Sequence, residues 1–353
     1  MSRRTWSSIL ACVLLVMLFG VAAFLPVPYV TMSPGPTVDV LAEIDGDEIV
    51  QVEGHRTFKT EGELELTTVS VTGPGQELSL AEAMAAWFDQ TRAVYPRDVV
   101  YEPEQSDEDA RRESSVQMVS SQDSAIAAAL TELDYDLPVV IEVLEVSKGA
   151  PAEGKLETGD KLVSVNGTKI TNATSVTKAV QKSGVGEKAA FVVRRDGGTK
   201  TVTVTTEADE DDPDRAVVGV IVGKGYSFPF EVSVDLSDEI GGPSAGLIFA
   251  LAVFDTLTPA ALTDGVVVAG TGTIEADGNV GPIGGIQQKI VAAADSGAAL
   301  FLVPPDNCDS ALEARVADGE IKLVKARSLH SAVASIEAYV EDENADLPKC
   351  ESR

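Results

Sequence analysis

The sequence Gly241-Gly242-Pro243-Ser244-Ala245-Gly246 is a Gly-rich turn, and the apolar run LIFALAVF, residues 247–254, follows it directly. No ionisable side chain occurs between positions 241 and 254, although the 353-residue chain carries a formal charge of -29. This pattern predicts a turn that leads into a buried helix, with Ser244 at the helix N-terminus. Backbone N–H groups at that end can stabilise a developing oxyanion, so Ser244 is a candidate nucleophile. Serine is also a common N-cap residue, and the turn alone does not separate the two roles.

Lys289 is the one ionisable residue within residues 278–294, GNVGPIGGIQQKIVAAA. Because 24% of the chain is charged, a window of this length should contain about four such residues. The lysine follows the Gly284-Gly285 pair, in the first turn of an expected helix. Burial and the positive end of a helix both lower the pKa of an ammonium, and a lysine needs a pKa of roughly 7–8 to act as a general base. The alternative is a lysine with a buried stem whose amine reaches water.

Together, these two stretches resemble the proteolytic domain of the Lon-type peptidases. In that family a G-P-S-A-G turn carries the nucleophile and an IGG-I-x-x-K segment carries a lysine base; the corresponding residues here are 242–246 and 283–289. Between them, residues 271–274, TGTI, are similar to a strand of the family, and residues 297–304, GAALFLVP, to the strand after the lysine helix. The resemblance extends over about residues 230–307.

The resemblance implies a Ser–Lys dyad in which Ser244 attacks the scissile carbonyl and Lys289 takes its proton. Thr271 is the expected hydrogen-bond partner of the lysine, and backbone N–H groups of the turn would hold the oxyanion. The supporting residues of this expected site are Thr271, Gly242, Pro243 and Ala245. One departure is that Gly241 stands where ATP-dependent Lon enzymes carry Asp. We expect no cofactor and no metal at this site.

Two rival functions are open, and one of them uses the same serine. The turn also fits G-x-S-x-G, the nucleophile elbow of α/β-hydrolases, with His330 as the base. The other rival is a membrane-tethered PDZ adaptor in which the Lon-like part is a scaffold. No phosphate-binding G-x-x-x-x-G-K-[ST] motif occurs in the 353 residues, which favours a peptidase without an ATP-driven motor. Its substrates would be flexible or unfolded protein segments.

The N-terminus predicts a membrane anchor. Arg3 and Arg4 precede an uncharged run of 20 residues from Trp6 to Leu25, which as a helix spans roughly 30 Å. The basic end should stay in the cytoplasm, so the rest of the chain is expected outside the cell membrane. The competing interpretation is a cleaved signal peptide, with residues 21–23 as its processing site.

Composition limits the partners. The chain has 56 acidic and 27 basic residues, and phosphate contacts need clustered Lys and Arg, so we expect no nucleic-acid binding. Cys308 and Cys350 either pair or remain two thiols, and Cys12 falls in the apolar run. The resemblance to ring-forming Lon-type domains also allows a homo-oligomer.

Residues 78–91 have a helical apolar pattern, with Leu80, Met84, Trp87 and Phe88 on one side, and we expect that side to pack in the core. Residues 102–113 are polar and acidic and are expected to form an exposed loop. Residues 114–133 are again helical in pattern.

Residues 150–170, APAEGKLETGDKLVSVNGTKI, look like part of a PDZ domain. PDZ domains bind peptides by adding a strand to an open sheet edge, and the groove beside an expected helix at residues 175–182 is the candidate site. The usual carboxylate-binding loop is not visible, because residues 136–139 stand in its place and Pro138 lacks an N–H. Binding of free C-termini therefore stays open, as does the alternative of a spacer domain.

The expected fold class is α+β: a Lon-type proteolytic domain of mixed α/β structure with a PDZ-like β-rich domain, preceded by one transmembrane helix. The acidic run EADEDDPD marks a boundary. We expect the catalytic domain to be split around the PDZ-like insert, because residues 215–340 are too short for a whole Lon-like domain. The expected segments are an anchor (1–29), a first Lon-like part (30–133), a PDZ-like domain (134–206), a linker (207–214), a catalytic part (215–340) and a tail (341–353).

Overall fold

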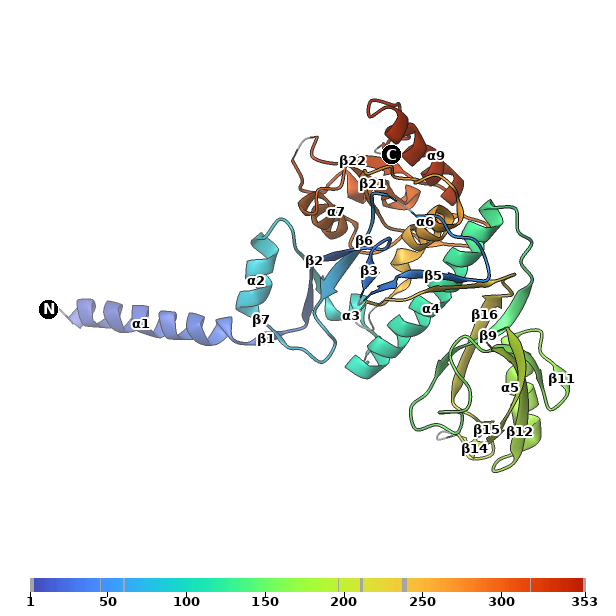
Figure 1. The fold of residues 1–353 in the computed structure, drawn as a ribbon. Helices are drawn as coiled ribbons and strands as arrows, with labels where there is room; N and C mark the ends of the chain where they lie inside the picture. The colour runs from blue at the N-terminus through green and yellow to red at the C-terminus, as the bar shows by residue number, and fades with distance from the viewer. Residues whose placement is uncertain are drawn as a thin grey trace.

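The computed structural model describes residues 3–44, 46–59, 61–103, 105–195, 197–209, 212–236, 240–317 and 319–351. Three parts follow one another in space: a projecting helix α1 (Arg3–Ala23), a large mixed α/β body and a smaller β-rich body (Figure 1). Within the described residues, one helical segment, Thr5–Ala23, is long and apolar enough to cross a membrane.

A first sheet forms the centre of the α/β body, with the strand order β22-β21-β18-β6-β2-β8. Its strands are β2 (Tyr29–Asp39), β6 (Glu63–Val71), β8 (Ala93–Pro96), β18 (Val267–Gly270), β21 (Leu300–Val303) and β22 (Lys322–Lys325). Strand β6 runs parallel to β18, with Glu63 opposite Val267, and antiparallel to β2. The sheet therefore combines strands from the first hundred residues with strands from the last hundred.

Helices pack around this sheet because their apolar residues need a partner surface. They are α4 (Asp107–Glu132), α6 (Gly246–Leu257), α7 (Ile286–Asp295) and α9 (Leu329–Glu341). Helix α6 is apolar over residues 246–254 and almost wholly buried, as expected for the run at residues 247–254. Helix α4 lies along α6 in the same core (Figure 1). A ribbon of β5 (Val50–Glu53) and β17 (Glu231–Val234) again joins early and late segments.

Helix α4 begins earlier than expected, and the predicted loop at residues 102–113 is therefore partly wrong. Ser106 is the N-cap and forms a capping box with Asp109. Three acidic residues in the first turn lie at the positive end of the helix dipole, where negative charge is stabilising. The acidic run is thus a helix start rather than a solvated loop.

A second sheet forms the β-rich body, with the strand order β13-β12-β10-β9-β16 and β11 beside β10. Its elements are β9 (Val139–Val146), β10 (Lys161–Val165), β11 (Thr168–Lys169), α5 (Ala173–Ser183), β12 (Lys188–Arg195), β13 (Gly198–Thr205) and β16 (Val220–Tyr226). It has a hydrophobic core of its own. Strand β16 pairs with β9, so this body continues past the boundary expected at residues 207–214.

The C-terminal tail, expected as a separate segment at residues 341–353, is fixed to the α/β body. Cys308 and Cys350 form a disulfide, which decides the alternative that the sequence left open. The Lys325 N–H donates to the Pro348 carbonyl at 2.8 Å, and Leu347 is buried. Cys12 is a free, exposed cysteine on α1.

The helix at residues 80–88, α2 (Leu80–Phe88), turns its large apolar side chains outward. The expectation that Leu80, Met84, Trp87 and Phe88 pack in the core is wrong, because the buried face of α2 consists of Ala83 and Ala86.

The other short elements are β1 (Pro26–Val27), β3 (Glu43–Ile44), β4 (Asp47–Glu48), β7 (Leu78–Ser79), α3 (Arg97–Val100), β14 (Glu207–Ala208), β15 (Ala216–Val217), η1 (Pro243–Ala245), β19 (Thr273–Ile274), β20 (Val280–Gly281), η2 (Pro305–Asn307) and α8 (Cys308–Ala311).

Candidate active site

Ser244 lies in a short 3-10 turn, η1, that leads directly into α6. Gly242 precedes the turn with φ +88°, a backbone conformation that favours glycine, and Pro243 then starts η1 with its restricted φ. The N-cap of η1 is Gly242 and the N-cap of α6 is Ala245, and neither helix has a side-chain capping bond. The Ser244 hydroxyl therefore does not act as the N-cap of either helix.

Helix α4 holds this turn in place from the side. The Gly242 N–H donates to the Ser114 carbonyl at 3.0 Å, and the Ser121 hydroxyl donates to the Pro243 carbonyl at 3.1 Å. A Cβ atom on Gly241 would collide with the Ser114 side chain. Position 241, where the sequence departs from the Lon pattern, thus lacks room for a side chain because α4 packs against it.

A glycine also allows α7 to carry Lys289 to the sheet. Gly285 precedes α7 with φ +71°, and a Cβ atom there would lie 2.7 Å from Met32 Sδ and 2.8 Å from Val69 Cγ1. Since both contacts are far below ordinary van der Waals distance, only glycine allows α7 to approach β2 and β6 this closely. This approach brings Lys289, one turn into the helix, over Thr67 in the middle of β6.

The Lys289 amine lies 2.8 Å from Ser244 Oγ, 3.1 Å from Thr271 Oγ1 and 2.8 Å from the Thr67 carbonyl oxygen. The residue is only 2% exposed. The alternative of a lysine that reaches water therefore does not describe the structure. All three expected residues with reactive or polar side chains, Ser244, Lys289 and Thr271, meet at one point.

Burial lowers the pKa of Lys289 from 10.5 to about 7. The cause is desolvation, which disfavours the charged ammonium when water is excluded. Its partners are a carbonyl and two hydroxyl oxygens, none of which carries a formal charge. Near neutral pH a large fraction of the amine is therefore uncharged.

Thr271 links the lysine to the serine. Its hydroxyl lies within hydrogen-bonding distance of Lys289 Nζ and donates to the Ser244 carbonyl at 3.0 Å. The Gly272 N–H donates to the same carbonyl at 2.9 Å. The chain just after β18 thus fixes the backbone of the turn as well as the position of the amine.

Thr67 is a residue of the site that the sequence did not indicate. Its carbonyl accepts from Lys289, and its hydroxyl donates to the Gly270 carbonyl at 3.2 Å. The contact to the lysine uses a backbone atom of a central strand, so no side-chain pattern could have marked it.

A cleft of about 1110 Å³ opens onto Ser244 and Lys289. One wall is the C-terminal half of β6, and the opposite wall is formed by α4, including Ser114 and Met118. Strand β18 pairs only with residues 63–66 of β6, so the edge of β6 beyond Leu66 faces this cleft. The geometry offers an extended chain a path past the serine.

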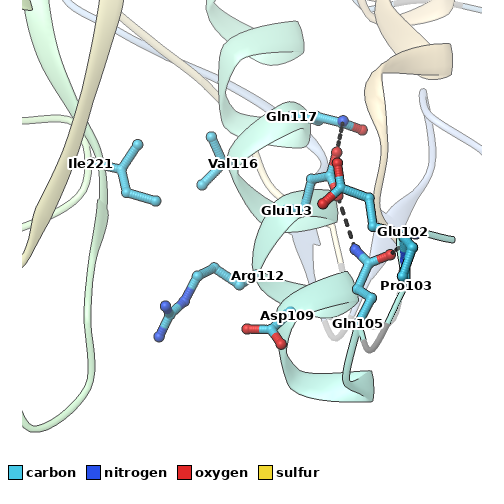
Figure 2. Close-up of a pocket in the computed structure, with 9 residues that line it drawn as sticks. All are labelled: Glu102, Pro103, Gln105, Asp109, Arg112, Glu113, Val116, Gln117 and Ile221. Carbon is cyan, nitrogen blue, oxygen red and sulfur yellow. Dashed lines mark hydrogen bonds between the residues drawn. The ribbon is translucent and has the colours of Figure 1, made fainter. Parts of the chain in front are cut away.

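A second cavity, of about 650 Å³, lies between α4 and the edge strand β16. Figure 2 shows Ile221 of β16 facing Val116 and Arg112 of α4 across it. Neither Ser244 nor Lys289 lines this cavity. Its walls belong to the two bodies, so it is a space between them rather than a part of the serine site.

The base that a Ser–His hydrolase would need, His330, lies away from Ser244. His330 is 78% exposed in its side chain, bonds Glu132 through Nδ1 at 2.7 Å, and is not among the residues that line the serine cleft. Among the described residues, no cluster of three or more His, Cys, Asp or Glu side chains could hold a metal ion.

Comparisons with known families match both bodies. A model of the Lon protease (S16) C-terminal proteolytic domain matches residues 239–333, which contain the turn, Thr271 and Lys289. A model of the PDZ domain matches residues 113–206. The chain contains a Lon-type proteolytic domain and a PDZ domain. The expected domains and the expected fold class are thus confirmed.

The relatives are distant and the matched segments short. Lon protease 2 of Bacillus subtilis (strain 168) is 36% identical over 87 residues, which are 25% of this chain and 14% of that protein. Archaeal Lon protease of Archaeoglobus fulgidus is 28% identical over 97 residues, 28% of this chain and 15% of that protein. This chain aligns with 7% to 15% of the length of the curated relatives that it matches.

Among solved structures, the PDZ domain of the SdrC-like protein from Listeria monocytogenes is similar, with 15% identity and a TM-score of 0.22 over 24% of this chain and 86% of that one. The described strands of the PDZ sheet end at β13 on one side and at β16 on the other, and β16 lies beyond the matched residues. Residues 136–139, where the sequence suggested looking for a carboxylate loop, precede β9, and both edges of β9 are paired. A peptide strand can add only to a free edge, so residues 136–139 do not precede a strand to which a peptide could add.

Proposed function

We propose that this protein is a serine endopeptidase that uses Ser244 and Lys289 as a catalytic dyad. The observation that supports this most directly is the buried amine, 2.8 Å from the serine hydroxyl, with a pKa lowered to about 7. A neutral amine has two N–H donors and one lone pair. When it donates to the Thr67 carbonyl and to Thr271 Oγ1, its lone pair is left for the proton of the Ser244 hydroxyl.

The reaction then proceeds by acyl transfer. Lys289 takes the hydroxyl proton while Ser244 Oγ bonds to the scissile carbonyl carbon, and the lysine returns that proton to the leaving amine as the C–N bond breaks. A water molecule enters, loses a proton to Lys289 and attacks the acyl carbon. The C–Oγ bond breaks and the serine regains its proton, so the dyad returns to its starting state.

The oxyanion would be held by backbone N–H groups of η1. Pro243 has no N–H, and the Gly242 N–H already donates to the Ser114 carbonyl. This leaves the N–H groups of Ser244 and Ala245 for the developing charge. Of the expected supporting residues, Gly242 and Pro243 thus shape the turn, and Ala245 donates.

The peptidase works without ATP and outside the cell membrane in this proposal. The 353 residues contain no G-x-x-x-x-G-K-[ST] motif, and in this proposal the substrates are flexible segments that enter the cleft without an unfolding motor. Helix α1 tethers the protein, with Arg3 and Arg4 on the cytoplasmic side. The Cys308–Cys350 disulfide suits an oxidising compartment. Membrane fractionation of the full chain, with alkaline extraction, tests the tether.

The PDZ domain supplies a peptide-binding edge. Strand β16 has a free edge. Two of its residues, Val220 and Val222, pack with α5 in the PDZ core. Gly219, with φ +72°, precedes it, and a Cβ atom there would collide with Ala150. A peptide that adds beside β16 would present its side chains to α5. Titration of fluorescent peptides with free and amidated C-termini would show whether the carboxylate is read.

The division of the chain also remains our proposal. We interpret residues 30–133 and the segment after β16 as one catalytic domain with the PDZ domain inserted, supported by the β6–β18 and β5–β17 pairs. Limited proteolysis that released residues 30–130 as a stable unit would contradict it. Whether the protein forms a homo-oligomer stays a prediction.

The decisive experiment measures cleavage of a fluorescently labelled, unstructured polypeptide by the full chain in detergent, without ATP. Ser244→Ala and Lys289→Met should each lose nearly all activity while keeping the wild-type circular dichroism. Ser310→Ala and Lys59→Met, which change exposed residues outside the cleft, are the matched controls. An active Ser244→Ala protein would reject the proposal. Loss of activity in His330→Ala would favour the Ser–His hydrolase, and an inactive wild type that still binds peptides would favour the adaptor.

A further inference from the structure

Helix α2 has the reverse of the usual polarity of a surface helix. Its inward face is made of small residues, with Ala86 at 1% exposure. Its outward face carries large apolar side chains at positions i, i+4, i+7 and i+8, which are Leu80, Met84, Trp87 and Phe88. Trp87 and Phe88 are 69% and 75% exposed. An ordinary surface helix buries such residues, so this face calls for an apolar partner.

The position of α2 indicates what that partner is. Strand β1 pairs with β7, with Pro26 opposite Ser79 and Val27 opposite Leu78. The Leu80 N–H donates to the Leu25 carbonyl at 3.0 Å, so the first residue of α2 is bonded to the residue where the apolar N-terminal run ends. Phe24 and Leu25 are themselves exposed and continue the apolar surface from α1.

Helix α2 also lies in the direction that a membrane surface requires. In Figure 1, α2 runs across the direction of α1 and beside its C-terminal end. If α1 crosses the bilayer, α2 then lies along the bilayer surface. Tryptophan at the border of such a patch is typical of the interface between headgroups and acyl chains.

Hydrogen bonds attach both ends of α2 to neighbouring segments. A capping box between Ser79 and Glu82 fixes its start, and its C-cap residue Asp89 accepts from the Thr91 N–H and hydroxyl. The Thr91 carbonyl accepts from Gln288, the neighbour of Lys289 on α7, at 3.3 Å. A series of hydrogen bonds thus connects the C-terminal end of α2 to the helix that carries Lys289.

We propose that α2 is a second membrane contact, whose outward face of Leu80, Met84, Trp87 and Phe88 inserts into the interface of the same bilayer that α1 crosses. The proposal rests on the membrane tether proposed above. Two attachments, one spanning and one lying on the surface, fix the orientation of the serine cleft relative to the membrane. Substrates would then be segments that reach the cleft close to the bilayer.

The chain has two tryptophans, Trp6 in α1 and Trp87 in α2, and each can report separately. The full chain is reconstituted in phosphatidylcholine vesicles with acyl chains brominated near the headgroup, and its tryptophan emission is compared with that in unbrominated vesicles. In Trp6→Phe, the emission of Trp87 should be shifted to shorter wavelength and quenched by bromine. In the same background, Met84→Gln/Phe88→Gln should lose most of this quenching, and Leu312→Gln, a change at an exposed leucine elsewhere, should keep it.

The companion variant Trp87→Phe reports on α1 through Trp6. Quenching of Trp6 without quenching of Trp87 overturns the second contact and leaves the tether intact. Absence of quenching at both positions overturns both. The emission of Trp87 could instead shift more as the amount of protein per vesicle increases and yet not be quenched by bromine. That result would mean that a second copy of the chain covers α2, and it would also overturn the proposal. The readout does not need peptidase activity, so it is independent of the dyad.

Discussion

Lys289 Nζ lies 2.8 Å from Ser244 Oγ, although one residue belongs to α7 and the other to the turn before α6. The amine is buried among neutral oxygens, and this environment decides its charge. Most of the behaviour that we expect of the protein follows from that pair and from the two helices, α4 and α7, that hold it.

The first prediction concerns the pH dependence of activity. The protonated lysine cannot accept the serine proton, so kcat/KM should rise with pH through the Lys289 pKa of about 7 and then level off. The measurement is kcat/KM for an uncharged peptide across the pH range. A rise that occurs only near the ordinary lysine value of 10.5 would mean that the amine is not desolvated in the working enzyme.

The same pKa predicts a pH-dependent stability. Because the folded pKa of about 7 is below the unfolded value of 10.5, the unfolded state binds more protons between these values, and stability should rise with pH across this window. Lys289→Met removes this contribution. Its urea midpoint relative to wild type should therefore be highest below pH 7 and fall as the pH increases, whereas Lys59→Met should show a constant difference.

A third prediction separates positioning from chemistry at Thr271. Thr271→Val removes the hydroxyl that bonds Lys289 and the Ser244 carbonyl, and we expect kcat to fall about tenfold, the value of one hydrogen bond of roughly 1.4 kcal/mol. The midpoint of the pH profile should also shift, because the amine loses a partner. Thr271→Ser, which retains the hydroxyl, should restore both. An unchanged pH profile in Thr271→Val would leave Thr271 with a purely structural role.

A fourth prediction concerns the contact between the PDZ domain and α4. Glu142 of β9 is buried and lies close to Asp123 of α4. Both acids surround Gly225: a Cβ atom placed on that glycine would collide with the Glu142 carboxylate and would lie 2.9 Å from Asp123 Oδ2. Burial, together with the charge of Asp123, raises the pKa of Glu142 from 4.5 to about 8. Lys161, at 3.3 Å, offsets this only in part.

Because the pKa of Glu142 is higher in the folded state than in the unfolded state, the contribution of this group to the stability of the fold is greatest below pH 4.5. That contribution is lost as the pH rises through about 8. Glu142→Gln cannot ionise, so its Tm should exceed that of wild type above pH 8, by about 2–4 °C for each kcal/mol gained. Glu187→Gln, on the exposed surface of the same domain, is the control. A Tm gain that is the same at acidic and alkaline pH would contradict the assignment.

The last prediction concerns the disulfide. Cys308 and Cys350 close a loop across a separation of 42 residues, for which loop-closure entropy gives about 4 kcal/mol. Cys308→Ser/Cys350→Ser should therefore melt at a distinctly lower temperature while still cleaving peptides in the cold, because neither cysteine lines the serine cleft. Cys12→Ser is the matched control. A double variant with an unchanged Tm would show that the bond does not form in the protein.

Several features could be predicted because they depend on neighbours in sequence. The turn at Gly242-Pro243-Ser244 and the isolated Lys289 are local patterns, and with the strand at residues 271–274 they identified the Lon-type domain. The apolar run before Leu25 and the PDZ pattern at residues 150–170 were equally local. Turns, helices and apolar segments of this kind depend on residues that are close together in the chain, so their patterns can be recognised directly in the sequence.

Other features depend on contacts between distant segments. Periodicity placed Trp87 and Phe88 on one face of a helix, but it could not show that this face points away from the core, since either orientation has the same pattern. The Thr67 carbonyl, the packing of α4 against Gly241 and the addition of β16 to the PDZ sheet likewise have no local signal.

The sequence by itself determined the family, the order of the motifs and the residue types available for chemistry. Only the tertiary structure decided that the Lys289 amine is shielded from water and within reach of Ser244, because desolvation depends on what β6, α4 and α7 place around it. The same holds for the outward side of α2, whose position is set by the pairing of β1 with β7, in which Pro26 lies opposite Ser79.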